Sequence, residues 1–334
     1  MQLKKLVSSA IIAAIFVLLL GSCNFTPPAS EGFLIVTTLF PQYDYARQIV
    51  GDKAEVVLLL SPGAESHAYE PSPADVIRIN SCDLFIYTGE YMEPWVGRIE
   101  DSVDNPEVVF VDTSKGIALT ANDIIDGAHI HEDGEEDHGH ENEEGEHGHD
   151  HDHGDEEELY DPHIWTNPLH AKVMVGNILE AVCTADEENA VFYRQNAEAY
   201  KLRLDALDGQ IRSDLADRVR SELVFGSRCA FYYFIEEYGL SFSAAFDSCS
   251  EDADPGVKRI TELIDKVRDD AIPVVYYEEM TSPQIANSIA EQTGARVLPL
   301  HTCHNLTRVQ FDEGIGYIEL MEQNLESLRE GLCK

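Results

Sequence analysis

Basic residues are scarce in this chain of 334 residues, which has 23 Lys and Arg against 62 Asp and Glu and a formal net charge of -39. An acidic surface repels phosphate, and nucleic-acid binding needs a basic stripe that so few cations do not provide. The composition therefore argues against nucleic-acid partners and favours cations. Because 44% of the residues are hydrophobic, the chain can fold, and its length allows two domains with cores of their own.

Several motifs of catalysis and metal binding are also absent. The sequence has no Cys-x-x-Cys pair, which argues against a thioredoxin-type redox site and against a zinc ribbon. It has no H-E-x-x-H and no G-x-S-x-G, the motifs of zinc peptidases and of serine hydrolases. The five methionines show no repeated pattern, which argues against a copper site.

Long hydrophobic runs are limited to one, Leu6–Leu20, which follows two lysines and is followed by Gly21, Ser22 and Cys23. This order is typical of a bacterial lipoprotein signal, here residues 1–22, with Cys23 as the lipidated first residue and 23–33 as a tether. The alternative is a membrane-spanning signal anchor, but the run is shorter than the roughly 20 residues that a spanning helix needs. We therefore expect a lipid-anchored protein on the extracytoplasmic face of the cell membrane, at the cell surface or in the periplasm.

Strands and helices alternate along the rest of the chain. Strands are predicted at 33–40, 54–60, 83–89 and 107–112, and again in the second half at 222–226, 240–246, 273–279 and 295–300. Helical segments lie between them, which is typical of an α/β fold with mainly parallel sheets flanked by helices. We expect two such lobes, 34–186 and 220–334.

One long helix is predicted between these lobes, over 187–219. Its apolar residues recur at spacings of three and four: Leu204, Leu207, Ile211, Leu215 and Val219. The helix would span about 45 Å at 1.5 Å per residue, which is longer than one small lobe. A plain amphipathic helix within a single domain is the alternative. We interpret the segment as a rigid helix that joins the lobes, with a binding crevice between them.

Histidines fall into two groups. The insert 127–158 holds fifteen acidic residues, eight histidines and no Lys or Arg, so we expect a disordered loop that binds zinc weakly. Its histidines are His129, His131, His138, His140, His147, His149, His151 and His153.

The other histidines lie in foldable sequence. His67, His163 and His301 lie in loops of the kind that meet at the carboxyl ends of parallel strands. Three imidazoles with one open position suit zinc, although a surface or hydrogen-bonded histidine is the alternative for each. His170 is interpreted as a surface residue of its helix. Asp161 precedes Pro and is either a turn former or the acceptor that orients a ligand imidazole.

Several segments together resemble a known family. They are VTTLFPQYDYARQIVGD, PGAESHAYEPSPADV around His67, DPHIWTNPLHAKVM around His163, the AFYYFIEEYGL helix, and the acidic insert just ahead of DPHIW. In these the chain resembles the ZnuA-like substrate-binding lipoproteins of zinc and manganese ABC importers. The resemblance implies a metal bound between two lobes and its delivery to a membrane permease driven by a separate ATPase, without enzymatic activity. We expect a monomer.

The resemblance also implies a ligand set, carried over residue by residue. His67 and His163 match the first and second ligands, but the third position holds Arg228, which has no lone pair to donate. We expect Arg228 to point away from the metal or to be neutralised by an acidic neighbour such as Glu278. The fourth position, acidic in the family, falls on His301, and this nitrogen donor favours zinc over manganese.

The expected site is therefore His67, His163 and His301, completed by water or an acidic side chain. His304 and Glu278 are further candidates. Manganese as cargo, and a secreted zinc hydrolase or lyase, are the alternatives for the function.

Cysteines 249 and 303 are predicted to lie close together near this site. Disulfides persist in an oxidising compartment, and we expect a bond between Cys249 and Cys303 that fixes the loop of His301. The alternative is that Cys303 itself ligates the metal through H-T-C-H.

Overall fold

The computed structural model describes residues 32–121, 160–246 and 256–334 of the chain. Apart from Gly32, these residues belong to one unit, Phe33–Lys334. The predicted signal segment, Cys23, the insert 127–158 with its eight histidines, and Cys249 lie outside the described residues.

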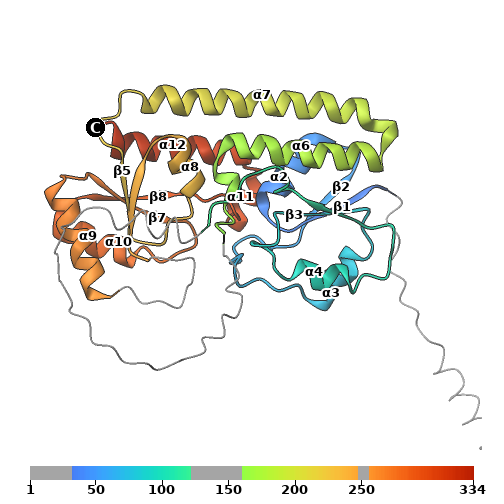
Figure 1. Ribbon diagram of the computed structural model, residues 1–334, viewed down its shortest axis with the longest axis horizontal. Coiled ribbons are helices and arrows are strands. Elements are labelled where there is room, and N and C mark those ends of the chain that lie inside the picture. Colours follow the sequence, from blue (N-terminus) through green and yellow to red (C-terminus); the bar gives the residue numbers. More distant parts are fainter. Residues whose placement is uncertain (1–31, 122–159, 247–255) are drawn as a thin grey trace, which may run out of the picture. The chain divides into compact units, whose positions relative to one another are not determined.

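The first lobe is built on a four-stranded parallel sheet. Its strands β1 (Leu34–Thr37), β2 (Glu55–Leu58), β3 (Leu84–Tyr87) and β4 (Val109–Asp112) have the order β2-β1-β3-β4. Helices α2 (Phe40–Val50) and α6 (Pro168–Ala185) cover one face, and α3 (Pro73–Ile79) and α4 (Val96–Glu100) cover the other (Figure 1). Burial on both faces explains why β1 is apolar at successive positions.

The second lobe repeats this arrangement. Strands β5 (Glu222–Phe225), β6 (Ser241–Ala244), β7 (Val274–Glu278) and β8 (Arg296–Leu300) form a parallel sheet of order β6-β5-β7-β8. Helices α9 (Val257–Asp269) and α10 (Gln284–Thr293) pack on one face, and α12 (Tyr317–Leu332) packs on the other. The short helices α8 (Tyr232–Glu237) and α11 (Arg308–Glu313) complete the lobe. The predicted two-lobe α/β fold is confirmed.

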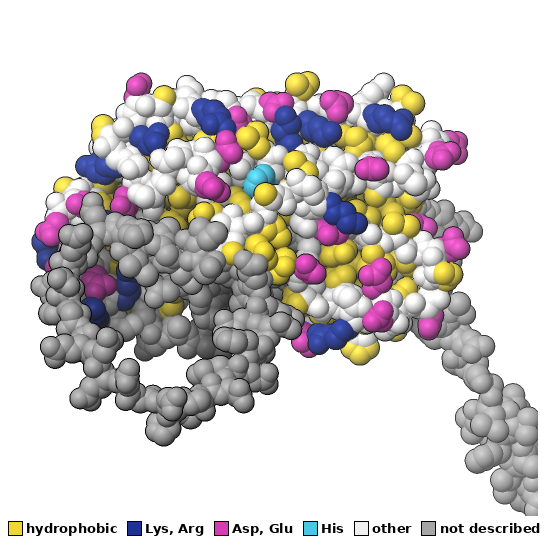
Figure 2. Space-filling model, in the orientation of Figure 1, with side chains coloured by type: hydrophobic (Ala, Val, Ile, Leu, Met, Phe, Trp, Pro, Cys, Tyr) yellow, Lys and Arg dark blue, Asp and Glu magenta, His cyan; other side chains and the backbone are white. Residues whose placement is uncertain are grey.

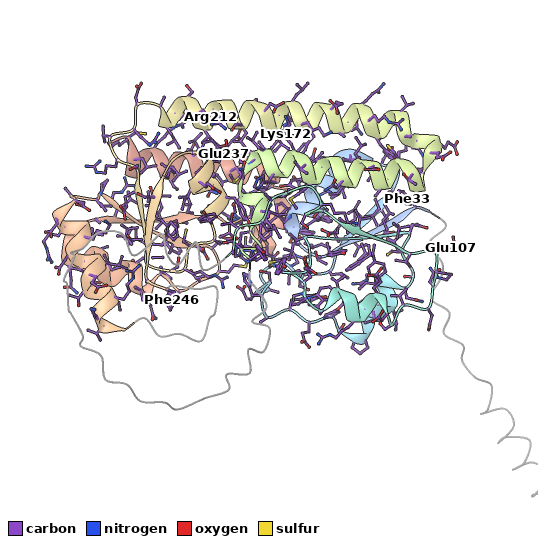
Figure 3. The ribbon with its side chains drawn as sticks, in the orientation of Figure 1. Phe33, Glu107, Lys172, Arg212, Glu237 and Phe246 are labelled. Atoms are coloured by element: carbon purple, nitrogen blue, oxygen red, sulfur yellow. The ribbon has the colours of Figure 1, made fainter. Side chains whose placement is uncertain are left out.

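The long helix α7 (Ala190–Leu215) joins the lobes, preceded by a 3₁₀ turn, η2 (Glu187–Asn189). Its 26 residues span about 39 Å, and it packs against α6 and α2 of the first lobe and α12 of the second (Figure 1). Ion pairs tie it to both sides: Asp205 pairs with Lys172 of α6, and Arg212 pairs with Glu237 of α8 (Figure 3).

The predicted end of this helix at Val219 is wrong. The helix ends at Leu215, and Val219 is an exposed residue that lies beyond it. The backbone N–H groups of Val219 and Arg220 instead donate to the carbonyl oxygen of Leu332, at 2.9 and 3.2 Å. The chain therefore leaves the helix to pair with the end of α12.

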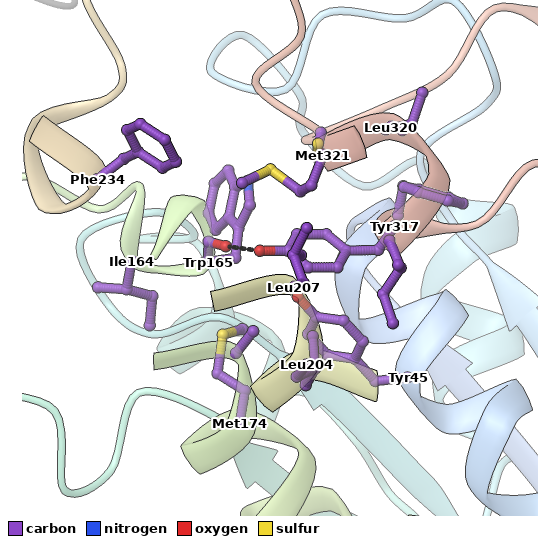
Figure 4. Packing of buried hydrophobic residues seen from close by; sticks show 14 of the residues in the cluster. Tyr45, Ile164, Trp165, Met174, Leu204, Leu207, Phe234, Tyr317, Leu320 and Met321 are labelled. Carbon is purple, nitrogen blue, oxygen red and sulfur yellow. Dashed lines mark hydrogen bonds between the residues drawn. The ribbon is translucent and has the colours of Figure 1, made fainter. Parts of the chain in front are cut away.

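One hydrophobic cluster extends from α2 through α7 to α12. Tyr45, Leu204, Trp165 and Tyr317 are buried in it together, and the Tyr317 hydroxyl donates to the Trp165 carbonyl oxygen at 2.6 Å (Figure 4). The surface over α6 and α7 carries interspersed acidic and basic side chains (Figure 2). Among the described residues, no helix has the length and apolar character that crossing a membrane requires.

Candidate metal site

His67 and His163 face each other in the first lobe. His67 lies in the loop between β2 and α3, and His163 lies directly before the 3₁₀ turn η1 (Ile164–Thr166). Their Nε2 atoms are 3.1 Å apart. Two imidazole nitrogens bound to one zinc ion at 2.0 to 2.1 Å with a tetrahedral angle would be about 3.3 to 3.4 Å apart. The two predicted ligands are thus brought together at nearly the spacing that a shared metal ion requires.

A carboxylate fixes the orientation of His163. Oδ1 of Asp161 lies 3.0 Å from Nδ1 of His163 and accepts its backbone N–H at 2.7 Å. Both side chains are almost fully buried. This contact favours the tautomer with hydrogen on Nδ1 and leaves the Nε2 lone pair available to a metal. Asp161 has both of the roles considered for it, because Oδ1 accepts the backbone N–H two residues on, as in a turn, and also contacts the imidazole of His163.

The environment of His67 keeps its imidazole neutral. Burial, the neighbouring His163 and the positive charge of Arg228 lower the pKa of His67 to about 2. A neutral imidazole is the form that ligates metal, so no proton has to leave this ring when a cation binds.

His304 lies beside the loop that carries His67. Its carbonyl oxygen accepts the backbone N–H of Phe40 at the start of α2. The next residue, Asn305, donates to the carbonyl oxygens of Ser61 and Ala64 at 2.9 and 2.7 Å. The loop after β8 is therefore attached directly to the first lobe, close to His67.

The imidazole of His304 is arranged like that of His163. Its Nδ1 lies 3.3 Å from a carboxylate oxygen of Glu279 and contacts the Thr302 hydroxyl, while its Nε2 is buried without a hydrogen-bond partner. Burial lowers the pKa of His304, and His163 and Arg228 contribute to this shift. A buried nitrogen with an unused lone pair is a suitable metal donor.

His301 occupies a different environment. Its backbone N–H donates to the Asn324 side chain of α12 at 2.6 Å, and its carbonyl oxygen accepts from the same side chain at 2.7 Å. Its Nδ1 accepts the backbone N–H of Cys303 at 3.0 Å and lies 3.2 Å from Glu279, and its Nε2 is also buried without a partner. His301 is thus held against α12 of the second lobe, and its place in the ligand set stays a prediction.

Arg228 is neutralised by two carboxylates, as expected. Its Nε donates to Glu278 at 3.1 Å and its guanidinium to Glu65 at 3.3 Å. Glu278 is fully buried and also accepts the backbone N–H of Ala230 at 2.7 Å. Burial raises the pKa of Glu278 to about 7, and the charge of Arg228 opposes this shift.

Within the ranges that the structure describes, no three His, Cys, Asp or Glu side chains are close enough together to hold a metal ion without movement. The preformed part of the site is therefore the pair His67 and His163.

The predicted disulfide is not confirmed. Cys303 is a buried free thiol, and its Sγ lies 3.4 Å from the carbonyl oxygen of His301. Its predicted partner Cys249 lies outside the described residues. The prediction for His170 also needs correction, because this ring is half-buried and packs edge-on against Tyr233 at a centroid distance of 5.2 Å.

Comparison with known proteins decides the family. The family model described as ZnuA, zinc-uptake complex component A periplasmic, matches residues 35–331. The chain belongs to the ZnuA family.

Relatives of known function are similar along the whole chain. The high-affinity zinc uptake system protein ZnuA of Bacillus subtilis is 34% identical, and the alignment covers 98% of each chain. The zinc-binding lipoprotein AdcA of Streptococcus pneumoniae is 32% identical over 96% of this chain and 60% of its own length.

Solved structures have the same fold. The metal-dependent lipoprotein YcdH of Bacillus subtilis has a TM-score of 0.73 at 31% identity, covering 90% of this chain and 100% of that one. The Zn(II)-bound ZnuA-like domain of Streptococcus pneumoniae AdcA has a TM-score of 0.72 at 29% identity, covering 91% and 100%.

Sequence reasoning overlooked three residues around the site of this ZnuA-family chain. Glu65 contacts Arg228, and Glu279 contacts His301 and His304. Asn305 connects the loop after β8 to the loop that carries His67. Glu65 lies two residues before His67, and Glu279 directly follows β7. The rule that parallel strands gather their ligand residues at the carboxyl ends would have included Glu279.

Proposed function

We propose that this protein captures Zn²⁺ outside the cytoplasm and delivers it to an ABC-type metal importer. The observation that carries the proposal is the pair His67 and His163, whose Nε2 atoms lie 3.1 Å apart, with His163 almost fully buried and the pKa of His67 lowered to about 2. Membership of the ZnuA family supports zinc as the cargo and a permease with a separate ATPase as the partners. On this proposal zinc is a substrate that is bound and released.

The ligands that we propose are Nε2 of His67, His163 and His304. All three are nitrogen donors, which zinc accepts more readily than manganese does. Two of the rings have Nδ1 beside a carboxylate, Asp161 for His163 and Glu279 for His304. This arrangement orients metal-ligating histidines in many proteins. His301 is the alternative third donor, and Glu278 is engaged by Arg228 and Ala230.

Capture without catalysis is favoured over a zinc hydrolase or lyase. A hydrolytic site needs an open coordination position that substrate can reach, together with a general base. Here His163 and His304 are almost fully buried, and the chain has no zinc-hydrolase motif. Membership of a metal-uptake family points in the same direction.

The remaining parts of the proposal concern residues outside the described ranges. The signal at 1–22 and Cys23 would anchor the protein by lipid to the extracytoplasmic face of the membrane. The eight histidines of the insert would bind further zinc ions weakly and raise the local zinc concentration near the crevice.

Competition titration of the metal-free protein against a chromophoric zinc chelator tests the function. We expect one tight zinc equivalent together with several weak ones. His67→Ala and His163→Ala should each weaken the tight equivalent by more than the 10- to 100-fold that is typical of residues outside the coordination sphere. His170→Ala, a control in the half-buried histidine of α6 that packs on Tyr233, should keep it. A wild-type protein without a tight equivalent, or equal effects of all three changes, would contradict the proposal.

A further inference from the structure

The positively charged side chain of Arg228 lies between two carboxylates. Its guanidinium joins Glu65, from the loop of His67, to Glu278, at the end of β7. The Arg228 side chain is 8% exposed, and that of Glu278 is 1% exposed. Arginine stays protonated in proteins, and its planar fork can serve two carboxylates at once. The cluster therefore places two carboxyl groups around one permanent positive charge.

Both carboxylates lie near the proposed zinc ligands. Oε1 of Glu65 accepts the backbone N–H of His67 at 3.2 Å, and its charge interacts with His304. Glu278 interacts electrostatically with His163. Without Arg228, these carboxylates would be released as oxygen donors in the neighbourhood of His67 and His163.

The chemistry of the available donors decides which cation is held. Zinc accepts imidazole nitrogen readily, whereas manganese prefers carboxylate, carbonyl and water oxygens. A site limited to imidazoles therefore discriminates against manganese. A site that adds one or two carboxylates loses part of this discrimination.

We propose that Arg228 determines metal specificity by keeping Glu65 and Glu278 in ion pairs, so that the site offers nitrogen donors to zinc and withholds oxygen donors from manganese. This inference rests on the proposed function and deepens it. Arg228 acts through the two glutamates and does not itself contact the metal.

The test compares zinc and manganese affinities of the full chain and its variants by competition titration. Arg228→Met removes the positive charge and releases both carboxylates, so we expect the ratio of manganese to zinc affinity to rise at least tenfold. Arg228→Lys keeps the charge and should keep a ratio near that of the wild type. The ratio is the diagnostic quantity, because losing a nearby positive charge strengthens the binding of any divalent cation to a similar extent.

A triple variant shows whether the carboxylates are responsible. Adding Glu65→Gln and Glu278→Gln to Arg228→Met removes the released oxygen donors and should restore the wild-type ratio. If circular dichroism shows that Arg228→Met is unfolded, Arg228→Gln replaces it. The glutamine amide can still donate a hydrogen bond to a carboxylate but carries no positive charge, so we expect the same rise in the ratio of manganese to zinc affinity.

Two results would overturn the inference: an unchanged ratio in the folded Arg228 variants, or a raised ratio that persists in the triple variant. Failure of the proposed function is distinguishable, because it would appear as the absence of tight zinc binding in the wild type.

Discussion

At the scale of single residues, His301 and His304 differ in what holds their backbones. His301 is attached to Asn324 in α12, whereas His304 accepts from Phe40 at the start of α2 and precedes Asn305, which is bonded to the loop before His67. The second environment is bonded to the loop that carries His67. This difference is the basis for assigning the third ligand to His304 in place of the residue predicted from the sequence.

We predict that His304→Ala weakens tight zinc binding more than 100-fold, because a directly coordinating nitrogen is lost. His301→Ala should weaken it about tenfold, since His301 acts only through Glu279, which it shares with His304. Calorimetric titration of the two variants under identical conditions measures both effects. The reverse order would restore His301 as the ligand, and an equal loss in both would point to a site that uses both rings.

Glu93 is a second residue whose environment has a measurable consequence. Its buried carboxylate joins the ends of β1 and β3 by accepting from the Thr38 hydroxyl at 2.6 Å and from the backbone N–H groups of Thr88 and Gly89. Burial raises the pKa of Glu93 to about 7, although these donors favour the ionised form. The folded protein therefore binds the Glu93 proton more tightly than the unfolded chain does.

We predict that this group makes the metal-free protein less stable as the pH rises from about 4.5 to about 7. Between pH 5 and pH 8, Glu93 should lower the free energy of unfolding by about 2 to 3 kcal/mol. Urea unfolding of the wild type and Glu93→Gln at both pH values isolates this contribution, because the variant lacks it. Parallel pH profiles of the two proteins would show that Glu93 titrates near its ordinary pKa.

At the scale of elements, local sequence patterns were sufficient to predict which segments form strands and helices, but not where those elements end. The spacing of three and four continues through Val219, yet the helix stops at Leu215 because Val219 and Arg220 bond to Leu332, a contact with the far end of the chain. The predicted strand 33–40 likewise ends at Thr37, because Phe40 and Pro41 begin α2 and proline suits the first helical turn.

The candidate site shows the same limit. The pair His67 and His163 could be predicted because motifs place both residues in loops of the first lobe. The choice between His301 and His304 could not be predicted. Cys303, which lies between them, has a φ of 65°, a backbone conformation that no spacing rule anticipates. The ion pair of Arg228 with Glu65 depends on contact between lobes, which the local sequence does not contain.

The insert is an element whose removal the fold should tolerate. Ala121 and Tyr160 form an antiparallel bridge, and Asp161 donates its backbone N–H to Thr120 at 3.0 Å. The two ends of the intervening segment are therefore held side by side by residues outside 127–158.

We predict that deleting 127–158 removes the weak zinc equivalents and leaves one tight equivalent, because the proposed ligands lie outside the insert. Zinc titration combined with thermal unfolding measures both parts of this prediction. Replacing the eight histidines of the insert by Ser at constant length is the matched control and should give the same titration. Loss of the tight equivalent in either variant would mean that the insert contributes a primary ligand.

At the scale of the whole molecule, two sheets of the same strand order are joined by α7 and by direct bonds between their loops. Asn305 and Arg228 both connect the second lobe to the segment from Ser61 to Glu65, which leads directly to His67. The position of the first ligand therefore depends on contacts with the other lobe.

The proposed delivery to an importer is favoured if the protein stays near the membrane. Cys23 is the proposed anchor. We predict that the wild type incorporates radiolabelled palmitate and sediments with membranes. Cys23→Ala should take up no label and should be released into the soluble fraction. The neighbouring change Ser22→Ala keeps a small residue before the cysteine and should leave both properties intact. The label and the fractionation together separate the two explanations of the N-terminal run, because a spanning signal anchor would keep Cys23→Ala in the membrane and would leave the wild type unlabelled.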